Sequence, residues 1–187
     1  MIILASQSPR RQEILEELGI SFQIVPSRYE EDNARDMAPE ELVRIQAEGK
    51  ALEVFQRTGS GAAVLGADTI VVLDGNVLGK PKDASDAERM LKALSGRTHQ
   101  VMTGVAVVGR KRMRSDVCMT EVQFRRLSEE EIRSYIATGE PMDKAGAYAI
   151  QGIGGAFVKA VNGSRSNVIG LPKKLTRRLL DEIEEIR

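Results

Sequence analysis

An apolar segment, residues 64–73, carries one acidic side chain, Asp68, near its middle. The run Thr69-Ile70-Val71-Val72 that follows is rich in β-branched residues, which suit the pleated surface of a strand. The segment therefore predicts a strand, in which an unpaired carboxylate would be costly to bury. Asp68 is expected either to end the strand at a solvated edge or to serve as a metal ligand or a base.

A polar turn, residues 6–11, follows an apolar stretch at residues 2–4 that predicts a short buried strand. Ser8 can cap a helix, and Pro9 suits the first helical position because the N–H that it lacks would be unpaired there. A helix N-terminus offers unpaired N–H groups and a partial positive charge. With two serines and two arginines beside it, this turn predicts either an anion-binding site or a capped surface helix with solvated arginines.

Helix and strand signals alternate along the rest of the chain. Ser128 and Glu131 form a capping box for a helix that ends at Gly139, whereas residues 146–163 are Gly-rich and predict few strands. Strands are also expected at 99–108 and 115–124, and a hairpin turn at 74–76 leads into 77–78. Further helices are expected at 39–55 and from Asp83 or Ser85 to Gly96. A last helix is expected to start at Pro172, with one apolar face formed by Leu175, Leu179, Ile183 and Ile186. This mixture predicts an α/β or α+β fold with a mixed sheet.

Composition narrows the class of protein. The chain has 187 residues, enough for one core or for one core divided into two lobes around a cleft. Basic and acidic residues number 27 each, so net charge gives no argument for a nucleic-acid or membrane partner. Cys118 is the only cysteine, which suits a reducing compartment. No apolar run approaches the roughly 20 residues that span a bilayer, and no signal peptide is evident, so a cytoplasmic location is expected.

Two more segments are candidates for the site. Lys80 follows the hairpin that could bring it back toward the end of the Asp68 strand, although a lysine before a proline is commonly a solvated loop charge. In residues 139–152, glycines permit close approach of the backbone to a ligand, and Gln151 can both donate to and accept from a base edge. As a bare pattern, this segment is a Gly-rich connection. His99 is the only histidine, which excludes a His-rich metal site and predicts a hydrogen-bonded residue in or near the core.

The motifs recur in one order along nearly the whole chain. They are residues 5–11, 66–71, 80–81, 95–104, 139–152, 162–164 and 168–172. Together they resemble the Maf family of nucleotide pyrophosphatases, and the set is specific although each motif is weak alone. The resemblance implies that residues 1–187 form a single domain that splits a nucleoside triphosphate into the monophosphate and pyrophosphate.

The same resemblance carries expectations about structure and partners. It implies an α/β fold like that of the inosine triphosphate pyrophosphatases, with two lobes around a central cleft and a long, curved mixed β-sheet. It also implies a divalent metal, Mg²⁺ or Mn²⁺, and a homodimer, since many members of the family form one. No nucleic-acid or membrane partner is expected.

Site residues are carried over position by position. Asp68 matches the family's catalytic acidic residue, and Glu31 resembles the second acidic residue near the metal, with Glu30 and Asp32 as alternatives beside it. Asp68 can take a proton from the attacking water or hold the metal, and both roles remain open. Together with Ser6 from the anion-binding turn, the implied substrate contacts are Ser8, Arg10, Arg11, Lys50, Thr69, Lys80 and Gln151.

Substrate choice follows from a smaller set. Arg11, Thr69 and Gln151 match positions tied to the base, and Thr69 with Gln151 looks like the branch that acts on dTTP and UTP. An alternative function is a nucleotide-binding regulator of septum formation and cell division with incidental hydrolysis. A nucleic-acid-binding module based on residues 110–114 is opposed by zero net charge and an aromatic content of 4%.

Overall fold

The computed structural model describes residues 1–184. Over these residues the strands form one mixed sheet of seven strands in the order β2-β1-β3-β5-β6-β7, with β4 paired to β3. β1 is parallel to β2 and β3, and the other pairings are antiparallel. The strands are β1 (Ile2–Leu4), β2 (Phe22–Ile24), β3 (Val64–Leu73), β4 (Asn76–Leu78), β5 (Thr98–Val108), β6 (Met113–Phe124) and β7 (Val158–Asn162).

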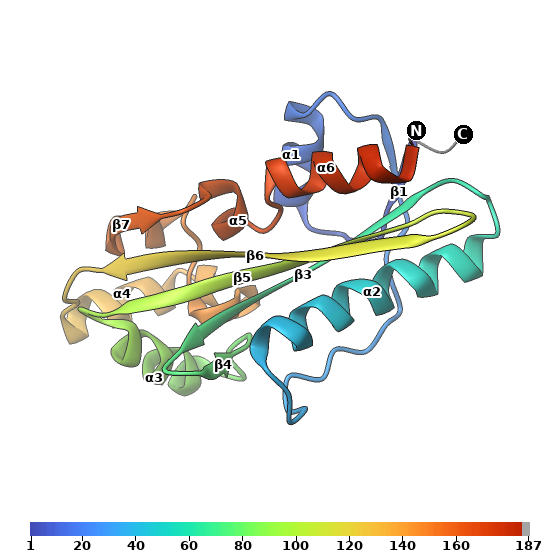
Figure 1. Ribbon diagram of the computed structural model, residues 1–187. Helices are drawn as coiled ribbons and strands as arrows, with labels where there is room; N and C mark the ends of the chain where they lie inside the picture. The colour runs from blue at the N-terminus through green and yellow to red at the C-terminus, as the bar shows by residue number, and fades with distance from the viewer. Residues whose placement is uncertain (185–187) are drawn as a thin grey trace.

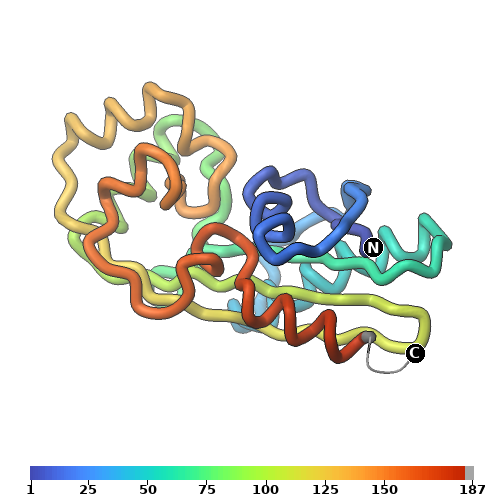
Figure 2. Tube along the Cα trace, turned by 90° about the horizontal axis from the view of Figure 1, so that it is seen from above, coloured from blue at the N-terminus to red at the C-terminus, as the bar shows by residue number. Residues whose placement is uncertain are grey.

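Helices cover the two faces of this sheet. They are α1 (Pro9–Glu17), α2 (Pro39–Thr58), α3 (Ala84–Leu94), α4 (Glu129–Ala137), α5 (Arg165–Ile169) and α6 (Lys173–Glu184), with short 3₁₀ helices η1 (Glu140–Asp143), η2 (Ala145–Ala147) and η3 (Ile153–Phe157). Figure 1 shows α2 along one face of the long strands, with α1 and α6 on the other face. The helices α3 and α4 gather near the far end of the sheet, so the elements form two groups (Figure 2).

Alternation along β3 explains why both faces are covered. Leu65 and Ala67 are fully buried in a cluster with residues of α1 and α6. Val64 faces the other way, into a cluster with Ala47 and Ala51 of α2. Beyond the midpoint, Val71 and Leu73 pack instead with α3 and α4. One long strand thus contributes to the core at both ends of the molecule, and the predicted mixed sheet with two lobes is confirmed.

Gly66 on β3 sets how closely α2 approaches the sheet. A Cβ atom at this position would lie 2.5 Å from the carbonyl oxygen of Ala47 and 2.8 Å from the amide nitrogen of Ala51. Such contacts with backbone atoms cannot be relieved by a side-chain rotation, so a side chain here would push the helix away. The glycine therefore keeps the polar side chains of α2 within reach of the strand's edge.

Several predicted boundaries are confirmed. Ser8 caps α1 by accepting from the amide of Arg11, and Ser128 and Glu131 form the capping box of α4. Asp83, rather than Ser85, caps α3. The second helix continues to Thr58, beyond the predicted end at residue 55. Ile186, expected on the apolar face of the last helix, lies outside the described residues.

The prediction of a strand-poor region at 146–163 is wrong at its end. β7 lies there and pairs antiparallel with β6, because no glycine stands between Gly155 and Gly163, so that Val158-Lys159-Ala160-Val161 can extend along an edge. β2 was not predicted, since its three residues include the polar Gln23 and form no apolar run such as the one in β1. No helix within residues 1–184 is long and apolar enough to cross a membrane.

Candidate active site

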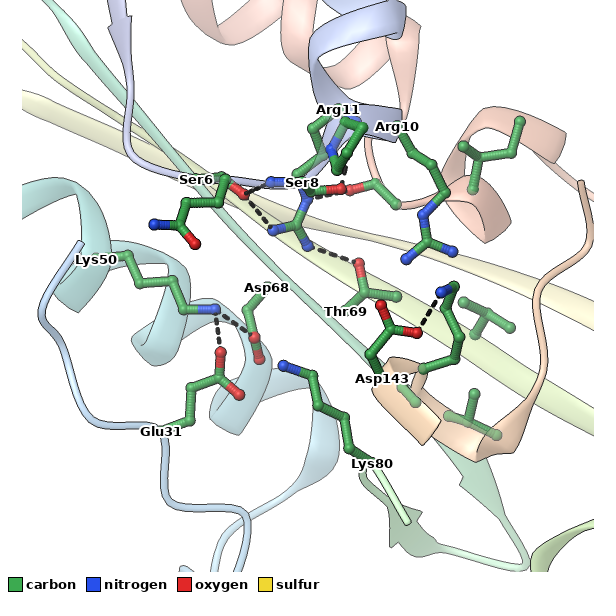
Figure 3. A pocket seen from close by; sticks show the side chains of 18 of the residues that line it. Ser6, Ser8, Arg10, Arg11, Glu31, Lys50, Asp68, Thr69, Lys80 and Asp143 are labelled. Atoms are coloured by element: carbon green, nitrogen blue, oxygen red, sulfur yellow. Dashed lines mark hydrogen bonds and ion pairs between the residues drawn. The ribbon is translucent and has the colours of Figure 1, made fainter. Parts of the chain in front are cut away.

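A cavity of about 740 Å³ lies where the two groups of elements meet. Most of the residues expected to bind substrate or metal line it, and Figure 3 shows their side chains around one space. They are Ser6, Ser8, Arg10, Arg11, Glu31, Lys50, Asp68, Thr69 and Lys80. Gln151 is exposed and is not part of the lining, although its neighbour Ile150 is.

The cavity opens along one edge of β3. β1 pairs with this strand only at Val64 and Leu65, and β4 pairs with it only from Val71 onward. Between these contacts, residues 66–70 pair with β5 alone among the described strands. We call this stretch the open edge of β3. Clefts at such points, where neighbouring strands diverge, are common ligand sites in α/β sheets.

The open edge explains why two consecutive residues reach the same cavity. Side chains on a strand alternate between faces, so Asp68 turns toward α2 while Thr69 turns toward α1. Both line the cavity because it extends around the strand's edge. The chain therefore places a carboxylate and a hydroxyl on opposite sides of one backbone, with different helices serving each.

Asp68 is nearly buried and fully engaged by α2. Its relative exposure is 4%. Lys50 Nζ lies 2.7 Å from Asp68 Oδ1, and Gln46 Nε2 donates to Asp68 Oδ2 over 2.9 Å. Gln46 and Lys50 are four residues apart, so they share one face of the helix. The burial cost of the carboxylate is thus offset by an ion pair and an amide hydrogen bond.

Glu31 completes a carboxylate pair around the same ammonium. Its Oε1 lies 2.6 Å from Lys50 Nζ, whereas Glu30 makes no ion pair within residues 1–184 and Asp32 pairs with Arg35. Partial burial acts to raise the pKa of Glu31, but Lys50 outweighs it and holds the pKa below its usual value. Of the three consecutive acidic residues, the structure brings Glu31 to Asp68.

Gly49 allows the segment bearing Glu31 to lie against α2. A Cβ atom here would be 2.2 Å from the ring of Tyr29, which packs on the bare backbone of the helix. Three residues after Tyr29, Asp32 N donates to Gln46 Oε1 over 2.7 Å. Contacts on both sides of Glu31 therefore fix the backbone from which it reaches Lys50.

Arg11 organises the other side of the open edge. Its guanidinium donates to Gly170 O at 2.9 Å, to Ser6 Oγ at 3.2 Å and to Thr69 Oγ1 at 3.1 Å. Burial lowers the pKa of this guanidinium and the charge of Asp68 opposes the shift, yet arginine remains protonated at any physiological pH. Arg11 is therefore a fixed cation that ties the turn before α1 to β3 and to the end of α5.

Arg10 and Lys80 are cations of a different kind. Within residues 1–184, neither side chain makes a hydrogen bond or an ion pair, and both extend into the cavity (Figure 3). Lys80 approaches the two carboxylates from the side opposite Lys50, and its charge contributes to the lowered pKa of Glu31. These two cations are available for an anionic ligand without breaking an existing contact.

Sequence reasoning missed three polar residues of this site. Asp143 and Lys144 line the cavity from the far group of elements and form an ion pair with each other. The third, Gln46, holds Asp68, and its position one helical turn before Lys50 is the signal that could have identified it. The Asp-Lys pair had no such signal, because it lies at the junction of the short 3₁₀ helices η1 and η2, which are too short to show a period.

The donor set suits a divalent cation brought by a phosphate ligand. Glu31 and Asp68 aim oxygens at one point, where Lys50 Nζ now lies. Among the described residues no group of three or more His, Cys, Asp or Glu side chains could hold a metal ion. Mg²⁺ is commonly bound by one or two carboxylates, with phosphate oxygens and water completing its shell, so two carboxylates are sufficient.

Cationic side chains outnumber carboxylates in this lining, which is the balance required by a polyanion that carries a metal. The cations are Arg10, Arg11, Lys50, Lys80 and Lys144, against Glu31, Asp68 and Asp143. These features define a protein that binds a polyphosphate-like ligand beside paired acidic groups.

Comparison of the sequence gives the family. A family model described as "Maf-like protein" matches residues 1–183, and the chain belongs to the Maf family.

Two curated relatives match over the full chain. A protein of Salmonella typhimurium named dTTP/UTP pyrophosphatase is 50% identical, and one of Shigella dysenteriae with the same name is 48% identical. Each alignment covers 100% of this chain and 94% of the relative. Among solved structures, the Ham1 protein of Staphylococcus aureus matches with a TM-score of 0.49 and 12% identity, over 98% of this chain and 96% of that one. A dITP/XTP pyrophosphatase of Mycobacterium abscessus matches with a TM-score of 0.46 and 15% identity, over 99% and 97%.

Proposed function

We propose that this protein hydrolyses dTTP and UTP to the nucleoside monophosphate and pyrophosphate. The observation that carries the proposal is the convergence of Asp68 and Glu31 on one cation within a cavity rich in Arg and Lys. The full-length similarity to dTTP/UTP pyrophosphatases supports it and supplies the substrate class.

The lining suggests how a nucleotide would lie. Its polar part holds the turn at residues 6–11 together with Lys50 and Lys80, while its apolar part includes Val71, Val101 and Val168. A triphosphate carries about four negative charges at neutral pH, which the polar part can balance. The base then faces the apolar part, and Thr69 lies where it can contact it from the open edge.

Residues around the phosphates have distinct tasks. Arg10 and Lys80 are unpaired within the described chain and bind phosphate oxygens directly, Arg by forked contacts and Lys as a point charge. The first turn of α1 lines the same cavity and adds the positive end of a helix dipole. Pyrophosphate is a good leaving group once these charges neutralise it, so no covalent nucleophile is required.

A divalent metal, Mg²⁺ or Mn²⁺, is part of the proposal, and Glu31 and Asp68 would hold it. When bound, the metal polarises the phosphate and neutralises charge that develops in the transition state. Lys50, which now fills the point between the two carboxylates, is then free to turn toward the phosphates.

Asp68 takes the proton in the proposed reaction. A water oxygen attacks the α-phosphorus, the bond from that phosphorus to the α–β bridging oxygen breaks, and pyrophosphate leaves with the bond's electron pair. The water's proton passes to the Asp68 carboxylate and then to solvent. Gln46 keeps this carboxylate oriented throughout, and a positioned base contributes about 10²–10⁴-fold.

The test is pyrophosphate release from dTTP, UTP, CTP, GTP and 7-methyl-GTP, with Mg²⁺ and with EDTA. Metal-dependent turnover of dTTP and UTP, with CTP poor, is expected. Turnover of 7-methyl-GTP alone would overturn the substrate class while keeping the reaction. Tight binding of dTTP with no turnover of any nucleotide would instead favour a nucleotide-binding regulator.

Two further expectations remain predictions. The homodimer is checked by analytical ultracentrifugation of the purified chain with and without nucleotide. The cytoplasmic location is checked by fractionation of the native host. Neither is needed for the chemistry above, because the residues discussed all come from one chain.

A further inference from the structure

A chain of polar contacts runs from the cavity into the sheet. Arg11 Nη2 donates to Thr69 Oγ1, and Thr69 Oγ1 lies 2.9 Å from Thr103 Oγ1 on β5. Thr103 Oγ1 in turn donates to the backbone carbonyl of Asn167 over 3.1 Å. Thr103 and Asn167 are fully buried and do not line the cavity. This series of hydrogen bonds therefore connects a residue at the open edge to buried groups that no ligand in the cavity can touch.

Asn167, at the buried end of this series of hydrogen bonds, is rigidly held. Asn167 Nδ2 donates to Val101 O and to Thr120 Oγ1, each over 3.0 Å, and its backbone N–H donates to Ser164 Oγ over 3.1 Å. With both amide hydrogens and the backbone amide committed, Asn167 cannot rotate without losing several buried contacts. Its carbonyl is thus a fixed acceptor for Thr103.

The direction of the hydrogen bonds follows from counting protons. A threonine hydroxyl has one proton to donate. Because Thr103 gives its proton to the Asn167 carbonyl, the contact between the two threonines requires Thr69 to be the donor. Thr69 also accepts from Arg11, so it has one lone pair left and no proton. The hydroxyl that faces the cavity is therefore an acceptor only.

We propose that Thr103 is a specificity-determining positioning residue, which fixes Thr69 as an acceptor for the N3–H of uracil and thymine. Cytosine has no proton on N3 and would face this lone pair with one of its own. The proposal rests on the proposed function, since it places a pyrimidine against Thr69. It assigns part of the discrimination to a residue that never contacts substrate.

Removing the Thr103 hydroxyl should reverse the polarity of Thr69. In Thr103→Val the shape is kept, but the proton of Thr69 loses its acceptor and can turn into the cavity. The hydroxyl then becomes a donor, which suits cytosine N3 and opposes uracil N3–H. An unmatched buried polar group costs enough to change a preference by roughly ten-fold. The preference for uracil over cytosine should therefore fall about ten-fold, whereas Thr103→Ser should keep it.

The experiment compares wild type, Thr103→Val, Thr103→Ala and Thr103→Ser in two measurements. One is the ratio of kcat/KM for UTP to that for CTP, and the other is the ratio of Kd for CMP to that for UMP by calorimetry. The matched control is Thr176→Val, because Thr176 is also fully buried and its hydroxyl has no partner within the described residues. Circular dichroism and thermal melts show that each variant is folded, and Thr103→Ala serves if Val does not fit.

The outcomes separate the two proposals. Loss of uracil preference in the Val and Ala variants, with Ser and Thr176→Val like wild type, supports the role of Thr103. Unchanged ratios in folded Val and Ala variants overturn it and leave the proposed function standing. If wild type shows no turnover, the proposed function fails, and the ratio of CMP to UMP binding still decides on Thr103. No turnover by wild type together with binding of neither monophosphate would overturn both.

Discussion

Lys50 Nζ lies between two carboxylates, 2.7 Å from Asp68 Oδ1 and 2.6 Å from Glu31 Oε1, and so joins α2, β3 and the segment before α2. Asp68 and Lys50 are both largely buried. A buried pair of this kind gives little net stability, but loss of one partner leaves an uncompensated charge. The arrangement is therefore better explained by the chemistry it prepares than by the stability it adds.

Asp68→Asn should abolish turnover. The amide cannot take a proton from water and carries no charge for a metal, so kcat should fall by about 10²–10⁴-fold or more. Steady-state pyrophosphate release from UTP measures this, with circular dichroism to show that the fold is kept. Asp116→Asn is the control, because Asp116 is an exposed carboxylate paired with Arg178 on the far side of the sheet. Near-normal activity of Asp68→Asn would sink the assignment.

Glu31→Gln should weaken the binding of the metal rather than the binding of the nucleotide. If Glu31 holds the metal with Asp68, the Mg²⁺ concentration for half-maximal activity should rise about ten-fold or more, since even indirect partners of metal ligands change affinity by ten-fold. A Mg²⁺ titration at saturating UTP measures it. Glu30→Gln is the matched control next in the chain, exposed and away from Lys50. An equal effect of both substitutions would remove Glu31 from the site.

Gly49→Ala should push the segment that carries Glu31 away from α2. Alanine favours an α-helix over glycine by about 1 kcal/mol, but here its Cβ would meet the Tyr29 ring at 2.2 Å. The segment carrying Glu31 should therefore shift away from Lys50, with a fall in kcat/KM of roughly ten-fold or more. Urea unfolding and UTP hydrolysis are the two measurements.

A double-mutant cycle checks that reason for the Gly49 effect. In a Tyr29→Ala background the clash is absent, and Gly49→Ala should then raise the free energy of unfolding by about 0.5–1 kcal/mol. If Gly49→Ala changes the free energy of unfolding equally with and without the Tyr29 ring, then close packing of this ring on α2 does not explain the need for glycine at position 49.

Helices and strands that have a strong signal within a few residues could be predicted from the sequence. The apolar run in β3, the serine cap of α1 and the capping box of α4 each have a physical cause within a few residues, and each was predicted. β2 and β7 were not, because each depends on a neighbouring strand rather than on its own pattern. β7 is mostly exposed and is held as a strand by pairing to β6.

Site residues divide in the same way. Asp68 was identifiable because a carboxylate in an apolar strand requires a reason, and Arg10 and Arg11 because they follow a helix cap. That Asp68 and Thr69 reach one cavity from opposite faces depends on where β1 and β4 leave β3, which no local pattern reports. The substrate role of Gln151 stays a prediction, since its side chain is exposed outside the cavity lining.

His99 makes folding stability depend on pH between 5 and 7. It is 2% exposed within an aromatic cluster, its Nε2 lies 2.7 Å from the Tyr148 hydroxyl, and burial lowers its pKa to about 4. In the unfolded chain this histidine binds a proton near pH 6.5, whereas in the folded chain it does not. Its contribution to the free energy of unfolding is therefore fully present above that pH and is lost as the pH falls. With these two pKa values, the free energy of unfolding falls by about 2 kcal/mol between pH 7 and pH 5.

His99→Gln isolates this effect, because His99 is the only histidine in the sequence. Glutamine keeps a polar partner for Tyr148 but does not titrate, and the carboxylates titrate alike in both proteins. Urea unfolding at pH 7, 6 and 5 should show wild type losing about 2 kcal/mol more than the variant over this range. Parallel curves for the two proteins would mean that His99 takes up its proton as readily in the folded chain as in the unfolded one, so that burial does not lower its pKa.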